Sequence, residues 1–197
     1  MRIVLITIAL SIFISCKDKE YPLPETTVQQ PQAILVKDTV VGVQPEETPA
    51  YSLTSQQINT GGTSPGELLT FARTLIGTPY KYACSDPALG FDCSGFINYV
   101  FNHFHIAVPR SSVDFTNAGR KVELANAKPG DLVLFTGTDS SIRVVGHIGI
   151  ISLYENGEFF FIHSSSGKAM GVTISALDKY YSGRFMKVIR VFPQNDA

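Results

Sequence analysis

The chain carries the segment FDCSGFINYVFNHF at residues 91–104. Apolar side chains recur in it every three or four positions, which is the spacing of one face of an α-helix. The segment therefore predicts a helix over residues 93–104 that buries one stripe and has Cys93 in its first turn. The residues of the stripe are Phe96, Ile97, Val100, Phe101 and Phe104.

Cys93 stands where a helix favours an anion, because the first backbone N–H groups are unpaired and the helix dipole is positive there. The thiolate is the nucleophilic form of cysteine, so this position suits a reactive sulfur. Gly95 in the same turn leaves room for a ligand or a second backbone to approach. The alternative is that Cys93 is a small buried residue without chemistry.

The segments on either side of this helix indicate an α+β fold. Upstream, Ser64-Pro65 and Glu67 form a helix-start signal for an apolar pattern over residues 65–76. Downstream of residue 128 the pattern becomes strand-like, and Asn156-Gly157 predicts a hairpin. Helices followed by strands predict an antiparallel sheet packed against helices. The expected strands cover residues 132–135, 144–153, 159–163 and 185–192.

Two histidines fall in the expected hairpin strands, His147 in the first and His163 at the end of the second. A hairpin that turns at residues 156 and 157 places His147 opposite a residue near 166, so the two imidazoles lie within a few positions of each other. A cysteine, a base and a group that orients the base form the general layout for acyl transfer. The alternative for His147 is a hydrogen-bonded strand histidine without a catalytic role.

The first 62 residues are expected to lie outside the folded domain. A positive start and a mainly apolar run over residues 3–14 predict a signal peptide over residues 1–15, since the run is too short to span a bilayer. Cys16, followed by charged residues, is typical of a lipoprotein cleavage site and would carry the lipid anchor; an ordinary signal with an incidental cysteine is the alternative. Residues 16–62 contain five prolines and are expected to form a flexible linker. The catalytic domain is expected over residues 63–195.

Composition excludes several classes of protein. Hydrophobic residues make up 44% of the 197 residues and charged residues 17%, as in globular proteins. The formal net charge is -1, which argues against nucleic-acid binding, because that function needs a basic surface. Three cysteines are too few for a disulfide scaffold.

Four motifs together resemble the NlpC-type cell-wall cysteine peptidases, a papain-like family. They are FDCSGF (91–96), KPGDL (128–132), GHIGI (146–150) and IHSS (162–165), in this order. The resemblance covers about residues 65–192 and implies a papain-like fold. It also implies hydrolysis of peptidoglycan stem peptides, typically between D-γ-glutamate and the next residue, meso-diaminopimelate or lysine. We expect a monomer with a peptidoglycan or muropeptide substrate and without a cofactor, in the cell envelope.

The resemblance also assigns roles to residues. Cys93 matches the nucleophile, His147 the general base and His163 the residue that orients the base. We expect the Cys93 thiolate to pair with the His147 imidazolium. The remaining matches are substrate contacts: Tyr80, Asp92, Ser94 and Ser112, of which Asp92 and Ser94 would hold the free amino group of L-alanine. Helix capping is the alternative role of Asp92.

Alternatives to this interpretation remain open. A disulfide between Cys84 and Cys93 would consume the nucleophile, although we expect a free Cys84. The two cysteines and His147 with His163 have the ligand types of a zinc site, but they lack compact motif spacing, so we expect no metal. In function, the alternatives are a non-catalytic wall-binding lipoprotein, and an amidase or acyltransferase on the same scaffold.

Overall fold

The computed structural model of the chain describes residues 57–196. Both expected helices are present. α1 spans Pro65–Thr74 and begins with a capping box, in which the Ser64 side chain and Glu67 bond each other's backbone N–H groups. α2 spans Cys93–His103, and its N-cap Asp92 accepts a hydrogen bond from the Gly95 N–H at 2.6 Å. The two helices therefore begin at the residues that their local sequence predicts.

A six-stranded antiparallel sheet forms the other layer, in the order β3-β8-β4-β5-β6-β7. The α+β fold with an antiparallel sheet against helices is thus confirmed. The strands are β3 (Arg120–Val122), β4 (Leu132–Thr136), β5 (Val145–Glu155), β6 (Glu158–Ser165), β7 (Gly171–Ala176) and β8 (Phe185–Arg190). Smaller elements are β1 (Ser85–Asp86), β2 (Gly90–Phe91), α3 (Lys179–Arg184), and the 3-10 helices Ser112–Asn117, Leu124–Asn126 and Pro193–Asp196.

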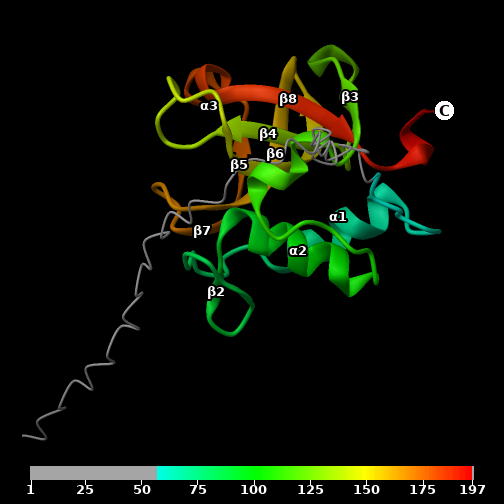
Figure 1. Cartoon of the computed structure of the whole chain (residues 1–197), viewed down its shortest axis with the longest axis horizontal. Helices are drawn as coiled ribbons and strands as arrows, with labels where there is room; N and C mark the ends of the chain where they lie inside the picture. The colour runs from blue at the N-terminus through cyan, green and yellow to red at the C-terminus, as the bar shows by residue number, and fades with distance from the viewer. Residues whose placement is uncertain (1–56, 197) are drawn as a thin grey trace, which may run out of the picture. The chain divides into compact units, whose positions relative to one another are not determined.

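Both faces of the sheet are covered. Figure 1 shows α1 and α2 together on one side of the sheet, and their apolar stripes form the larger core with Ile148, Ile150 and Ile162. The opposite face carries a smaller core that includes Phe135 and Phe161, against which residues of the α3 region pack. β3, β7 and α3 were not expected from the sequence.

The β5–β6 hairpin turns at Asn156 and Gly157, which both have positive φ, as a two-residue turn requires. Glu155 lies opposite Glu158, in the expected register. A bulge between Ile151 and Leu153 then shifts the pairing by one residue, so that Ile150 lies opposite Ile162. This shift moves His163 one place relative to His147.

The expected signal peptide, Cys16 and most of the expected linker lie outside the described residues. The last residues of that linker, 57–62, contact the domain: Ile58 is buried and its N–H donates to the Ala118 carbonyl at 3.3 Å. No helix within residues 57–196 is long and apolar enough to cross a membrane.

The KPGDL segment has a structural role. Asp131 is fully buried, and both of its carboxylate oxygens accept hydrogen bonds from Arg190, at 3.0 and 2.8 Å. It also accepts the backbone N–H of Lys128 at 2.8 Å. This ion pair joins the start of β4 to the end of β8 and leaves Asp131 outside the candidate site.

Candidate active site

The start of α2 brings the Cys93 sulfur against β5. Sγ lies 4.0 Å from the Gly146 carbonyl oxygen and accepts a hydrogen bond from the Ile148 backbone N–H. Gly146 and Ile148 flank His147 in the chain, so the sulfur sits beside the strand at the position of this histidine. Cys93 is partly exposed. No hydrogen bond joins Sγ to the His147 ring among the contacts of residues 57–196.

His147 and His163 form a direct pair, with 2.8 Å between His147 Nε2 and His163 Nδ1. His163 is fully buried, and its Nε2 lies 3.0 Å from the Ser175 hydroxyl. One consistent set of tautomers has His147 Nε2–H donating to His163 Nδ1 and His163 Nε2–H donating to the Ser175 hydroxyl. His147 Nδ1 then keeps a lone pair that can accept a proton.

Gly149 makes the contact between the histidines possible. It lies on β5 two residues after His147, on the same face. A Cβ atom at Gly149 would stand 3.3 Å from His163 Cβ and only 2.6 Å from Phe161 Cδ2. The absence of a side chain therefore gives the His163 ring its place next to β5.

The electrostatics of the site favour neutral groups at rest. Burial, and then the neighbouring Asp92 carboxylate, raise the pKa of the Cys93 thiol. Burial, His163 and Arg184 hold the pKa of His147 well below its usual 6.5. Both pKa shifts favour a neutral thiol and a neutral imidazole, whereas the sequence predicts a thiolate–imidazolium pair. The hydrogen bonds at the start of α2 do stabilise the thiolate, but they are outweighed by desolvation.

All four expected substrate contacts border one groove with Cys93. This groove has a volume of about 540 Å³, and its lining includes Tyr80, Asp92, Ser94 and Ser112. Burial, Cys93 and Asp92 raise the pKa of Tyr80, which keeps its hydroxyl protonated as a donor. The structure thus brings these four residues, from three separate segments, into one groove with the sulfur.

Arg110 also lines the groove and was not assigned a role from the sequence. Its guanidinium binds both carboxylate oxygens of Asp92, at 3.0 and 2.7 Å, and reaches the Ser94 hydroxyl at 3.1 Å. Asp92 therefore caps α2 and is also ion-paired. Asp92 and Arg110 are 18 positions apart, and the sequence between them carries no local signal for this pair, although Arg110 lies in the PRSS segment with Ser112.

The cysteines Cys84 and Cys93 are both free thiols. Instead of a disulfide, a backbone contact links their segments: a Cβ at Gly95 would lie 2.1 Å from the Cys84 carbonyl oxygen. Within the described part of the chain, no group of three or more His, Cys, Asp or Glu side chains is arranged to hold a metal ion.

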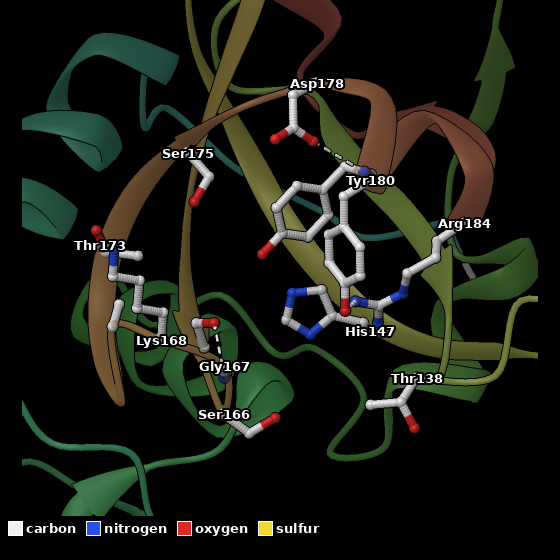
Figure 2. A pocket seen from close by; sticks show the side chains of 13 residues that line it. Thr138, His147, Ser166, Gly167, Lys168, Thr173, Ser175, Asp178, Tyr180 and Arg184 are labelled. Atoms are coloured by element: carbon white, nitrogen blue, oxygen red, sulfur yellow. Dashed lines mark hydrogen bonds between the residues drawn. The ribbon is translucent and has the colours of Figure 1, made fainter.

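A second cavity, of about 740 Å³, opens on the His147 side of the site. Figure 2 shows His147 in its wall, with Arg184 and Tyr180 of α3 beside it. The loop between β6 and β7 supplies Ser166 and Lys168. This cavity shares no lining residue with the Cys93 groove, so the site is open on two sides.

A cysteine at the start of a helix, beside two histidines on an antiparallel sheet, is the arrangement of a papain-like domain. The chain belongs to the NlpC/P60 family, whose model matches residues 77–190. A solved NlpC/P60 family protein from Bacillus cereus superposes with a TM-score of 0.59 and is 26% identical, over 68% of this chain and 42% of the other.

Two curated relatives show the same similarity. The Bacillus subtilis gamma-DL-glutamyl hydrolase is 32% identical over 139 residues, 71% of this chain and 33% of the relative. The Haemophilus influenzae probable endopeptidase NlpC homolog is 36% identical over 110 residues, 55% of this chain and 52% of the relative. The matched region thus spans a third of the first relative and about half of the second.

Proposed function

We propose that this protein hydrolyses amide bonds in peptidoglycan stem peptides, between D-γ-glutamate and the following diamino acid, with Cys93 as nucleophile. The observation that carries the proposal is the position of the Cys93 sulfur against β5 at His147, whose ring is held by His163 at 2.8 Å. The names of its relatives, a gamma-DL-glutamyl hydrolase and a probable endopeptidase, support the same chemistry.

In this mechanism His147 acts as a general base during the attack. Nδ1 takes the Sγ proton as the sulfur adds to the amide carbonyl carbon. The Cys93 backbone N–H and the Tyr80 hydroxyl donate to the carbonyl oxygen as it becomes negative. His147 then protonates the leaving amine, and water, deprotonated by His147, cleaves the thioester. His163 keeps the working tautomer of His147.

The groove around Cys93 would bind the amino-terminal side of the substrate. Asp92 and Ser94 would contact the ammonium group of L-alanine, and Ser112 the adjoining backbone. Arg110 holds the Asp92 carboxylate in place through two hydrogen bonds, so an ammonium group would join an existing ion pair. The Asp92 carboxylate would then lie between two cations and accept charge-assisted hydrogen bonds from both, which suits this role.

We further propose a place for the protein in the cell envelope. The signal peptide over residues 1–15 would direct export, Cys16 would carry the lipid anchor, and residues 16–62 would tether the catalytic domain of residues 63–195. The family match, together with a relative named peptidoglycan endopeptidase RipB in Mycobacterium tuberculosis, supports a role at the cell wall. The protein would act as a monomer.

Defined muropeptides test this function. The wild-type protein should release the dipeptide L-alanyl-D-glutamate from a stem tripeptide, and Cys93→Ala should lower the rate at least about a thousandfold. Cys84→Ser is the matched control and should retain activity, since its side chain has no role in the mechanism. Binding without cleavage by the wild type would favour the non-catalytic wall-binding protein, and cleavage of another amide or ester would favour the amidase or acyltransferase.

A further inference from the structure

The cavity on the His147 side faces the part of the substrate that leaves. His147 must protonate the leaving amine, so the nitrogen of the diamino acid has to come within hydrogen-bond distance of this ring. The cavity of about 740 Å³ has His147 in its wall, whereas the proposed function assigns the amino-terminal side of the substrate to the Cys93 groove. The diamino acid therefore extends into this cavity, if the proposed function holds.

Arg184 supplies an unbalanced positive charge in the wall of this cavity. It is only 7% exposed, and its guanidinium donates to the carbonyls of Gly137 and Thr136 and to the Tyr180 hydroxyl, at 2.8 to 2.9 Å. No carboxylate pairs with it among residues 57–196. Buried charges in proteins are ordinarily paired, and a guanidinium has five N–H donors, so Arg184 can still bind an anion. Figure 2 shows its guanidinium next to His147.

The other charged groups of the cavity are Lys168 and Asp178. Lys168 lies on the exposed β6–β7 loop and forms no ion pair within the described residues. Asp178 is exposed and caps α3, where its carboxylate accepts the Tyr181 N–H at 3.0 Å. The cavity thus offers two cations and one carboxylate. A ligand group that carries both a carboxylate and an ammonium is complementary to this set.

The two common diamino acids of stem peptides differ in the charged groups at the end of the side chain. The side chain of lysine ends in an ammonium group alone, whereas meso-diaminopimelate ends in a carboxylate and an ammonium on one carbon. We propose that the cavity with Arg184 and Lys168 binds this carboxylate and selects meso-diaminopimelate over lysine. This inference rests on the proposed function, because that function places the diamino acid here.

Binding measurements with the full-length Cys93→Ala protein test the inference without turnover. We expect L-Ala-γ-D-Glu-meso-diaminopimelate to bind at least about tenfold more tightly than L-Ala-γ-D-Glu-L-Lys in calorimetry, as a charge-assisted contact provides. Adding Lys168→Met or Arg184→Gln to the Cys93→Ala protein should reduce the ratio of the two affinities. Lys121→Met, on the distant strand β3, is the control and should leave this ratio unchanged. Lys168 is exposed, so its variant tests the inference even if Arg184→Gln fails to fold.

Several results would overturn the inference. They are equal affinity for the two peptides, no measurable binding of either, or an unchanged ratio in the folded variants. A third peptide, with D-isoglutamine in place of D-glutamate, separates the D-glutamate carboxylate from the carboxylates of the diamino acid. If the Arg184 and Lys168 variants lose affinity only when D-glutamate is present, the cavity binds that carboxylate and the inference is wrong.

Hydrolysis by the wild-type protein distinguishes this inference from the proposed function. Selective binding of the diaminopimelate peptide without its cleavage would contradict the proposed function and leave the subsite standing. Cleavage of both peptides with equal kcat/KM, together with equal binding, would support the function and overturn the subsite.

Discussion

At the scale of residues, the protonation of Cys93 and His147 depends on their surroundings more than on their type. A cysteine at a helix start is ordinarily acidified, yet here burial and the Asp92 carboxylate raise the thiol pKa. His147 is kept neutral by burial first, and then by its neighbours His163 and the positively charged Arg184. Both shifts favour a proton on the sulfur and a neutral His147, which is the state that the proposed general-base role requires.

Alkylation of Cys93 by iodoacetamide tests this state of the thiol. The rate should rise most steeply at or above pH 9, the ordinary pKa of the thiol being 9.0, because the thiolate is scarce below it. A thiolate–imidazolium pair would instead give a rapid plateau from about pH 5 to 8. Mass spectrometry of the Cys93 peptide measures the rate. His147→Ala should leave the rate of alkylation below pH 9 unchanged. A much slower alkylation of this variant below pH 9 would contradict a neutral thiol beside a neutral imidazole.

His163 links the site to the stability of the fold. Burial, with a smaller effect of Arg184, lowers its pKa from 6.5 to about 3. Between these values the unfolded chain binds a proton that the folded protein does not, so the free energy of unfolding falls as pH falls from 6.5 to 3. This loss amounts to on the order of 4 kcal/mol and is absent above pH 6.5.

Urea unfolding of wild type and His163→Gln at pH 7.5 and pH 4 measures this contribution. The wild type should lose more stability than the variant on acidification, because glutamine does not titrate. The stability difference between the two proteins should therefore narrow at pH 4. Parallel losses in both proteins would show that His163 is not the group responsible.

At the scale of elements, the start of α2 and the loop before it form one unit. Gly95 in the first turn of α2 lies against the Cys84 carbonyl, which in turn accepts the Asp92 N–H at 3.0 Å. The loop that carries Cys84 also positions Tyr80, through the Tyr80 bridge to Phe91 at the end of β2. The helix start therefore orients both Cys93 and one wall of the groove.

Gly95→Ala should disturb this unit. The added Cβ would stand 2.1 Å from the Cys84 carbonyl oxygen, so the loop that carries Cys84 must move. We expect the free energy of unfolding to fall by about 1–3 kcal/mol and kcat to be lower. Gly66→Ala in α1 is the matched control: no atom lies within 4 Å of its added Cβ, and alanine favours a helix. Chemical denaturation compares the two variants. Equal stability of both would refute the close packing at Gly95.

At the scale of the whole molecule, the domain presents two cavities on either side of Cys93 and His147. One is lined by Cys93 and the other by His147. A peptide that crosses the pair would place its two halves in different cavities, so each half can be recognised independently. The buried Arg190–Asp131 ion pair holds β4 and β8 together on the other side of β5 from β6.

Cys16→Ser tests the proposed membrane attachment of the full-length protein. Expressed with its own leader, the wild type should sediment with membranes, and the variant should move to the soluble envelope fraction, because serine cannot receive the lipid. Fractionation followed by immunoblotting measures the distribution. Cys84→Ser should remain with the membranes, and a membrane-bound Cys16→Ser protein would contradict the anchor.

The sequence by itself determined the elements whose signals are local. The capping box set the start of α1, Asp92 and the apolar stripe set α2, and Asn156-Gly157 set the β5–β6 hairpin. β7 and α3 escaped prediction because both are six residues long and lack a clear apolar period. Their formation depends on partners, the open edge of β6 for one and the smaller core for the other.

For the site, motif order in the sequence identified Cys93, His147 and His163, whose catalytic roles remain predictions. Only the tertiary structure decided what surrounds them. The partners Arg110, Ser175 and Arg184 lie in segments that the chain brings together through long-range packing, and their spacing carries no local signal. Burial and unpaired charge are likewise properties of the folded molecule, so the neutral resting state of the pair and the charge of the second cavity follow from the fold alone.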